Sequence, residues 1–452
     1  MALRPTIDFL LYDWLNAETL DQRSRFADHS RETFDAVLDT CERIAREKYA
    51  PFNRLVDTQE PHFDGEKVIL PQATHDAHKA FVESGLLSAS QDYDIGGMQL
   101  PYTVESAANA FFAMASVSIG SNMLTKGNAG LLMVHGTDAQ KEVFALNEFS
   151  GRWAGTMCLS EPQAGSSLSD VATRAVPDGP GSEADPLGPR FRLKGNKMWI
   201  SSGEHELTEN IIHLVLGKIT GPDGKLIPGT KGISLFIVPK KLVGTDGQLT
   251  GVRNDVALAG LNHKLGWRGT TNTLLNFGEG KYPVDGQAGA VGYLVGKPHE
   301  GLRCMFHMMN EARIGVGTAA VMLGMAGYTP RSTTPKTAPR AARSAPAAKM
   351  PRRPRFASLN TQMSNGCCWR RSRTAKVRWR WSCTAPAWWT SSTPVRQTPP
   401  TRPVCCSKCS PPLPKAGPAS FAWRPTRWRS RCTVVTATPV TSRWSSTGAT
   451  TA

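Results

Sequence analysis

The segment RFRLKGNKMWISSG, residues 190–203, is the first of several short stretches rich in β-forming residues. It is followed by IIHLVLGKI (211–219), GISLFIVPK (232–240) and TLLNF (273–277), with Gly, Pro, Asn and Asp between them. Short strands separated by turn residues are typical of antiparallel sheets. We therefore expect a middle antiparallel β domain over residues 152–296.

Helical patterns flank this domain on both sides. SRETFDAVLDTCERIAREKYAP (30–51) repeats apolar residues at helical spacing, with Ser30 as the N-cap and Pro51 as the stop. YTVESAANAFFAMASVSIG (102–120) has few charges, which predicts a buried helix. GLRCMFHMMNEARIGVGTAAVMLGMAGY (301–328) is apolar on nearly all sides, as in a helix inside a bundle, and its pattern stops at its last residue.

The fold class predicted from these patterns is α+β. An N-terminal helical domain is expected over residues 1–151, before the β domain. Residues 297–328 are expected to form the first helix of a C-terminal helical domain that is cut short. Residues 329–452 form a basic tail that we expect to be disordered, because its apolar side chains are too sparse to offset the entropy of ordering it.

The sign of the net charge changes close to the start of this tail. Residues 1–311 hold all 37 acidic residues and 29 of the 53 Lys and Arg residues, a net charge of −8, whereas residues 312–452 hold 24 basic residues and no acidic one. A total charge of +16 and a pI near 9.6 would normally indicate nucleic acid or an acidic membrane as the partner. Here these values describe the tail alone, so we expect neither partner for the folded part.

The compartment expected from the sequence is the cytoplasm. The N-terminal stretch has Pro and Asp within its apolar residues and does not resemble a signal peptide. No run approaches the roughly 18 apolar residues that would predict a membrane span. The cysteines before the tail, Cys41, Cys158 and Cys304, are widely spaced, which favours reduced thiols over a disulfide framework.

The tail has the composition of a displaced reading frame. Eight residue types (Arg, Pro, Ala, Ser, Thr, Cys, Trp and Gly) fill 103 of the 124 positions from Thr329 to Ala452, and all eight can be coded with G or C in the middle of the codon. The segment CTVVTATPVT from Cys432 is compatible with original codons reading V-H-G-G-Y-G-Y-T-R-D. A disordered basic tail and an RNA-binding tail using Arg and Trp remain alternatives. The zinc site suggested by Cys406-x-x-Cys409 is better explained by coincidence, so no metal is expected.

Three blocks of the folded part resemble a known family, the flavin-dependent acyl-CoA dehydrogenases. They are MCLSEPQAGSSLSDVATRA (157–175), KGNKMWISSGEH (194–205) and KLGWRGTTNTLLNF (264–277). The resemblance covers roughly residues 30–328 and is strongest for the larger branch that includes methylthiopropionyl-CoA dehydrogenases. The chain departs from the family pattern at Ser167, where the family usually has Asp.

The resemblance implies FAD as the cofactor and an acyl-CoA thioester as the substrate. An isoalloxazine ring needs a flat apolar wall and hydrogen-bond donors at its polar rim. The residues that the resemblance assigns to FAD are Met157, Leu159, Ser160, Gly165, Ser166, Trp199 and Ser201. Those that it assigns to the substrate are Ser166, Met309 and Arg313.

Some of these residues have alternative structural interpretations. A tryptophan in a strand is usually a core residue, so Trp199 has that alternative. Arg313 has a buried ion-paired arginine as its alternative to the substrate pocket. Glu161 supports a turn in the family and is given no catalytic role, and His263 and His307 are interpreted as structural.

The implied reaction removes the α-proton of the thioester with a glutamate while the β-hydride passes to the flavin, and the electrons leave to an electron-transfer flavoprotein. In the family the glutamate follows the Gly-Gly-Tyr-Gly-Tyr segment recovered from the tail, so no catalytic residue is assigned and this chain is expected to be inactive. The family also implies a homo-oligomer. The alternative is a flavin-fold scaffold whose authentic tail binds nucleic acid.

Overall fold

The computed structural model describes residues 3–119 and 122–333. Its first part is helical, with a small β1–β2 hairpin (His62–Phe63 and Val68–Ile69). The longer helices of this part are α2 (Arg31–Ile44), α4 (Gln72–Glu83), α5 (Tyr102–Ala115) and α6 (Asn122–His135). The shorter ones are α1 (Arg4–Asp8), α3 (Asn53–Thr58), α7 (Asp138–Gln140) and α8 (Leu146–Phe149).

Helix α2 begins where the sequence predicts. The Ser30 side chain accepts a hydrogen bond from the Thr33 amide, and the Thr33 hydroxyl accepts one from the Ser30 amide, which together form a capping box. Phe34, Leu38 and Cys41 are buried on one face of the helix. The helical backbone then continues as a π-helical turn to Tyr49, so the predicted helix is confirmed.

The second part is a β domain. Its strands are β3 (Trp153–Cys158), β4 (Arg174–Pro177), β5 (Arg190–Ser201), β6 (Asn210–Ile219), β7 (Ile233–Pro239), β8 (Lys241–Val243), β9 (Leu249–Arg253), β10 (Val256–Leu261), β11 (Asn272–Phe277) and β12 (Ala290–Val295). The main sheet has the order β10-β11-β5-β12-β7-β6-β3, with β4 paired to β5 and β6. Most pairs are antiparallel as expected, but β6 runs parallel to both β3 and β4.

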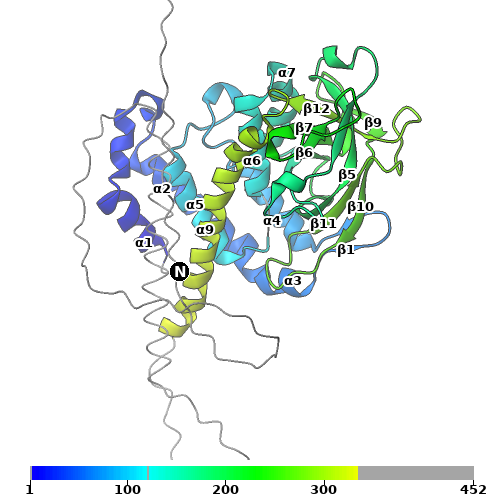
Figure 1. Ribbon diagram of the computed structural model, residues 1–452. Coiled ribbons are helices and arrows are strands. Elements are labelled where there is room, and N and C mark those ends of the chain that lie inside the picture. The colour runs from blue at the N-terminus through cyan, green and yellow to red at the C-terminus, as the bar shows by residue number, and fades with distance from the viewer. Residues whose placement is uncertain (1–2, 120–121, 334–452) are drawn as a thin grey trace, which may run out of the picture. The chain divides into compact units, whose positions relative to one another are not determined.

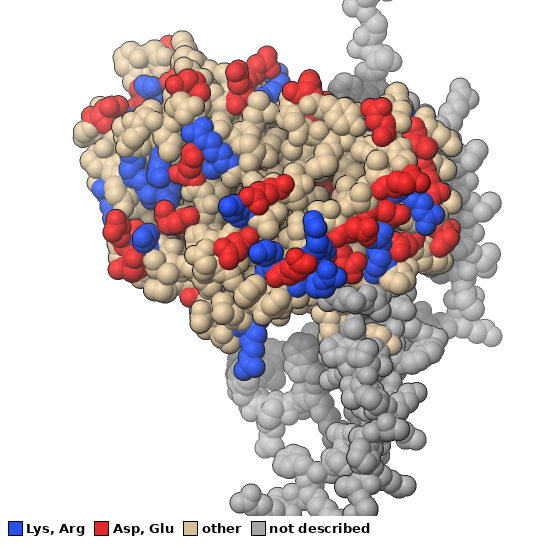
Figure 2. All heavy atoms as spheres, turned by 180° about the vertical axis from the view of Figure 1, so that it is seen from behind, with Lys and Arg blue, Asp and Glu red and all other residues tan. Residues whose placement is uncertain are grey.

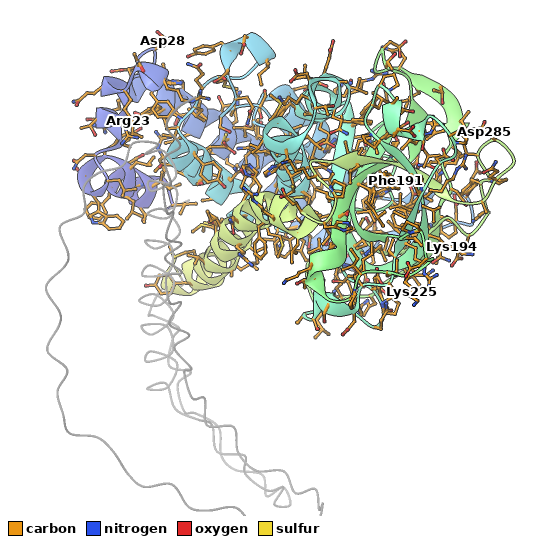
Figure 3. All side chains as sticks on the ribbon, turned by 45° about the horizontal axis from the view of Figure 1, so that its top comes forward. Arg23, Asp28, Phe191, Lys194, Lys225 and Asp285 are labelled. Carbon is orange, nitrogen blue, oxygen red and sulfur yellow. The ribbon has the colours of Figure 1, made fainter. Side chains whose placement is uncertain are left out.

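The long helix α9 (Gly301–Thr333) joins the two parts. It packs against α5, α6 and β7, and Figure 1 shows it in yellow between the N-terminal helices and the sheet. Figure 3 shows the same arrangement from another side, with Arg23 and Asp28 marking the N-terminal part, Lys194 marking the sheet and Asp285 a loop beside it. The helix runs past the predicted end at residue 328, because a change in composition does not by itself end a ladder of backbone hydrogen bonds.

Methionines of α9 belong to two separate cores. Met305 and Met308 pack with the buried side chains of the sheet. Met322 and Met325 pack with the buried side chains of α2, α4 and α5. Gly301 allows the helix to begin directly on β7, since a Cβ at this position would lie 2.2 Å from the Ser234 carbonyl carbon.

The surface of the described part carries mixed charges. Figure 2 shows Lys and Arg interspersed with Asp and Glu over the face that it displays. Across residues 3–119 and 122–333, no helix is long and apolar enough to span a bilayer. The same ranges contain no group of three His, Cys, Asp or Glu side chains that could hold a metal ion. The displaced-frame, zinc and RNA-binding interpretations of the tail lie outside the described residues.

Candidate functional site

Two of the sequence blocks lie side by side, although about forty residues separate them. The Met198 amide donates a hydrogen bond of 3.0 Å to the Ser160 carbonyl oxygen. The Lys197 ammonium donates to the Leu159 carbonyl oxygen at 3.1 Å. These bonds hold the end of β5 against the loop that follows β3.

Glu161 organises this loop. Its carboxylate accepts hydrogen bonds from the Ala172 and Thr173 amides at 2.8 and 3.1 Å and from the Lys197 ammonium at 2.8 Å. Burial opposes ionisation of the group, but Lys197 and the hydrogen bonds outweigh burial and hold the pKa of Glu161 below its usual value. All of these contacts are internal to the loop and its neighbouring strand, which agrees with a turn-supporting role.

Trp199 is exposed at the end of β5. Its side chain is 56% exposed, which excludes the alternative that it is a core residue. Its backbone has a φ of 63°, a left-handed conformation that a bulky residue adopts at an energetic cost. A large ring held in this way leaves a flat apolar surface exposed.

A cavity of about 450 Å³ lies next to this region. All three sequence blocks reach it: Met157 from β3, Ser201 from β5, and Lys264 with Trp267 from the loop before β11. Burial lowers the pKa of Lys264 to about 8, and its ammonium donates to the Thr270 carbonyl oxygen at 2.7 Å. Helices α5, α6 and α9 supply most of the remaining wall, which is largely apolar.

The other residues assigned to FAD are not among those that line this cavity. Leu159 is partly buried and packs against the core of the sheet. Gly165 and Ser166 lie exposed on the loop after β3. A Cβ built on Gly165 would meet no atom within 4 Å, so the described chain itself does not require glycine there.

The two substrate residues assigned on α9 are not among those that line the cavity. Met309 packs against the core of the sheet. Arg313 is exposed, donates to the Asn310 side chain at 3.0 Å and lies 5.2 Å from the centre of the Phe306 ring. The alternative of a buried ion-paired Arg313 is therefore wrong, because this side of the helix is uncovered in the described chain.

The two histidines lie away from the cavity wall. His263 is exposed and its Nδ1 lies 2.8 Å from a Glu60 carboxylate oxygen. The His307 ring lies edge-on to the His135 ring at 6.0 Å. Both arrangements agree with structural roles.

None of the three sequence blocks contains the charged helix residues that line the cavity. Glu105 on α5, Lys126 on α6 and Glu311 on α9 all line it. Lys126 donates a hydrogen bond to the Glu105 carboxylate. A signal was present in the sequence, since Glu105 is the one charged residue of α5, but its partners lie far away along the chain.

Known proteins are similar to this chain in sequence and in fold. Residues 31–149 match the model of the acyl-CoA dehydrogenase N-terminal domain. The chain is 38% identical over 320 residues to 3-methylmercaptopropionyl-CoA dehydrogenase of Ruegeria pomeroyi, covering 70% of this chain and 50% of that protein. The chain belongs to the acyl-CoA dehydrogenase family. A butyryl-CoA dehydrogenase of Syntrophomonas wolfei is 35% identical over 329 residues, with 70% and 50% covered.

Solved acyl-CoA dehydrogenase structures have a similar fold. The enzyme from Geobacillus kaustophilus superimposes with a TM-score of 0.57 at 16% identity, covering 80% of this chain and 84% of that chain. Butyryl-CoA dehydrogenase from Megasphaera elsdenii gives 0.56 at 16% identity, covering 80% and 81%. The chain spans about half the length of the curated acyl-CoA dehydrogenases that it matches.

Proposed function

We propose that the folded part of this chain is the FAD-binding and acyl-binding portion of an acyl-CoA dehydrogenase that passes electrons to an electron-transfer flavoprotein. The observation that carries this proposal is the meeting of Met157, Ser201 and Trp267, from three separate blocks, at one largely apolar cavity. Such a cavity with a few polar groups suits a thioester with an aliphatic acyl chain.

The residues present fit a flavin. The exposed Trp199 ring offers an apolar surface next to the cavity, and the Ser201 hydroxyl offers a hydrogen-bond donor two residues away. FAD, when bound, would accept the hydride released from the β-carbon of the thioester. The α-proton requires a separate base, which the family resemblance places outside the described residues.

The described residues would orient the substrate and exclude water. The apolar side chains of α5, α6 and α9 would surround the acyl chain, which keeps the reacting carbons in a dry site. The buried thiols of Cys41, Cys158 and Cys304 are free, which supports a reduced compartment such as the cytoplasm. A homo-oligomer is proposed from the family alone.

We propose further that the sequence after Tyr328 is a displaced reading frame, so that this chain lacks the base and is inactive. The experiment compares this chain with a version whose frame is restored near that codon. FAD content is measured by absorbance, and activity by reduction of a dye with a panel of acyl-CoA thioesters. Loss of a general base costs about 10²- to 10⁴-fold in rate. Equal rates in the two proteins would disprove the proposed location of the base.

A further inference from the structure

Three charged side chains of the helices line the largely apolar cavity, in addition to Lys264 from the loop before β11. Glu105, Lys126 and Glu311 come from three different helices, α5, α6 and α9, and both α5 and α6 pack against α9. The Lys126 ammonium donates to one Glu105 carboxylate oxygen and lies 5.1 Å from the centre of the Tyr102 ring. The side chains of Glu105 and Lys126 are only 2% and 12% exposed, so bulk water solvates neither of them fully.

The second carboxylate oxygen of Glu105 lacks a hydrogen-bond donor among the described residues. It is buried, and no residue in the described part of the chain donates a hydrogen bond to it. An unpaired buried acceptor carries a free-energy penalty, which a hydrogen-bond donor from a ligand would remove. Glu105 is among the residues that line the cavity, so a donor held there would lie beside this carboxylate.

The charge of this wall favours a neutral donor. Glu105 and Lys126 form an ion pair with no net charge. Burial raises the pKa of Glu311, and the nearby Glu105 adds to this effect while Lys126 opposes it. Because Lys126 already balances the charge of Glu105, a cationic ligand gains little attraction from this pair. A saturated alkyl chain placed here would leave the Glu105 oxygen unpaired.

We propose that Glu105, supported by Lys126 and Glu311, selects acyl thioesters that carry a hydroxyl group toward the distal end of the acyl chain. The hydroxyl would donate to the unpaired Glu105 oxygen. This inference rests on the proposed function, because it assumes that the acyl chain enters this cavity. It names a substrate class within that function, and Glu105 is the residue that determines specificity.

The test measures binding to the full chain by equilibrium dialysis with two pairs of isosteric thioesters. The pairs are γ-hydroxybutanoyl-CoA with pentanoyl-CoA, and ω-hydroxyhexanoyl-CoA with heptanoyl-CoA. In at least one pair the hydroxyl thioester should bind about tenfold or more tightly than its isostere, since a site built for a hydroxyl rejects an analogue without it. Equal binding within both pairs would overturn the inference.

A double variant, Glu105→Met with Lys126→Met, removes both charges together and leaves neither unpaired. It should lose the preference for the hydroxyl thioester. The matched control is Lys79→Met with Glu83→Met, a lysine–glutamate pair that is 75% and 63% exposed, and it should keep the preference. A double variant that keeps the full preference would assign the hydroxyl to another group and overturn the role of Glu105.

The binding results distinguish failure of the proposed function from failure of this inference. If the chain binds none of the four thioesters, both the acyl-binding function and the inference fall. If it binds all four without preference, the function stands and the inference falls. Equal binding by the unaltered chain overturns the inference whether or not the double variant folds, and the double variant then tests whether an observed preference comes from Glu105.

Discussion

The Lys197 ammonium lies 2.8 Å from the Glu161 carboxylate, and the two side chains are 0% and 3% exposed. The pair joins β5 to the loop after β3, where two of the family's sequence blocks meet. Removing one partner leaves a buried charge uncompensated, whereas removing both leaves an apolar contact. Replacing one partner should therefore lower the free energy of unfolding by more than replacing both.

Glu161→Gln should lower the free energy of unfolding by about 3 kcal/mol or more, because Lys197 then has no ionised partner. The double variant Glu161→Met with Lys197→Met should cost less than the single change. Urea denaturation followed by circular dichroism measures both. A double variant less stable than the single one would show that the hydrogen bonds of Glu161 to the loop amides matter more than the ion pair.

Trp199 should prove inessential for folding. Trp199→Gly should be more stable than Trp199→Ala by about 1 kcal/mol, because only glycine adopts the left-handed backbone without steric cost. Both variants should lose FAD binding, measured by flavin absorbance after gel filtration of the frame-restored protein. Trp153→Ala is the contrast, since Trp153 is fully buried and its loss should cost about 3 kcal/mol or more.

Glu148 on α8 should destabilise the native chain at neutral pH. It is fully buried, neither carboxylate oxygen has a hydrogen-bond partner within residues 3–119 and 122–333, and burial raises its pKa well above the usual value. Glu148→Leu should raise the free energy of unfolding by about 2 kcal/mol at pH 7.

The gain from Glu148→Leu should depend on pH. The unfolded state ionises the glutamate above about pH 4.3, whereas burial raises its pKa in the native state, so the penalty exists above that pH and fades below it. Denaturation at pH 7 and pH 4 compares the two conditions. Glu142→Leu, at an exposed site one turn and a half earlier, should show no such gain. A Glu148→Leu variant that is less stable at pH 7 would contradict the assignment.

Mild acid should destabilise the β domain through His213. Burial, with Lys240 and Arg253 nearby, lowers the pKa of His213 to about 3. The unfolded state binds a proton below about pH 6.5 and the native state does not, so stability is complete above that pH and falls below it. By pH 5 the loss from this residue should reach about 2 kcal/mol. His213→Gln should remove that part of the pH dependence, and His62→Gln, at an exposed site, should not.

The two ends of α9 should respond in opposite ways to alanine. Gly301→Ala should destabilise the chain, because the new Cβ would lie 2.2 Å from the Ser234 carbonyl carbon. Gly327→Ala should stabilise it by up to about 1 kcal/mol, since a Cβ there meets no atom within 4 Å and alanine favours the helix. Thermal unfolding of the two variants decides. Equal effects would show that the start of α9 does not depend on close contact with β7.

Local patterns predicted the elements better than their pairing. The Ser30 cap and the strand from Arg190 follow from neighbouring residues, so a single sequence contains the signal. The parallel pairing of β3 with β6 does not, because it joins segments that only the folded chain brings together. The left-handed backbone of Trp199 is likewise imposed by its surroundings, since its residue type gives no reason to expect it.

The candidate site divides in the same way. Met157 and Ser201, which are predicted to contact FAD, lie in recognisable blocks, and the structure brings both to one cavity. Glu105 and Lys126 are 21 residues apart on separate helices, so neither position suggests the other. Their pairing depends on how α5 and α6 are both placed against α9, which no local pattern describes.

The division of the α9 methionines between two cores has a consequence for synthesis of the protein. The ribosome synthesises the ten strands of the β domain before it adds the α9 methionines. Met305 and Met308 come first, and Met322 and Met325 follow. Until then, the nascent chain holds two unfinished apolar surfaces at once. We therefore expect the emerging polypeptide to depend on chaperones that shield such surfaces, and to reach its native state in one late step as α9 leaves the exit tunnel.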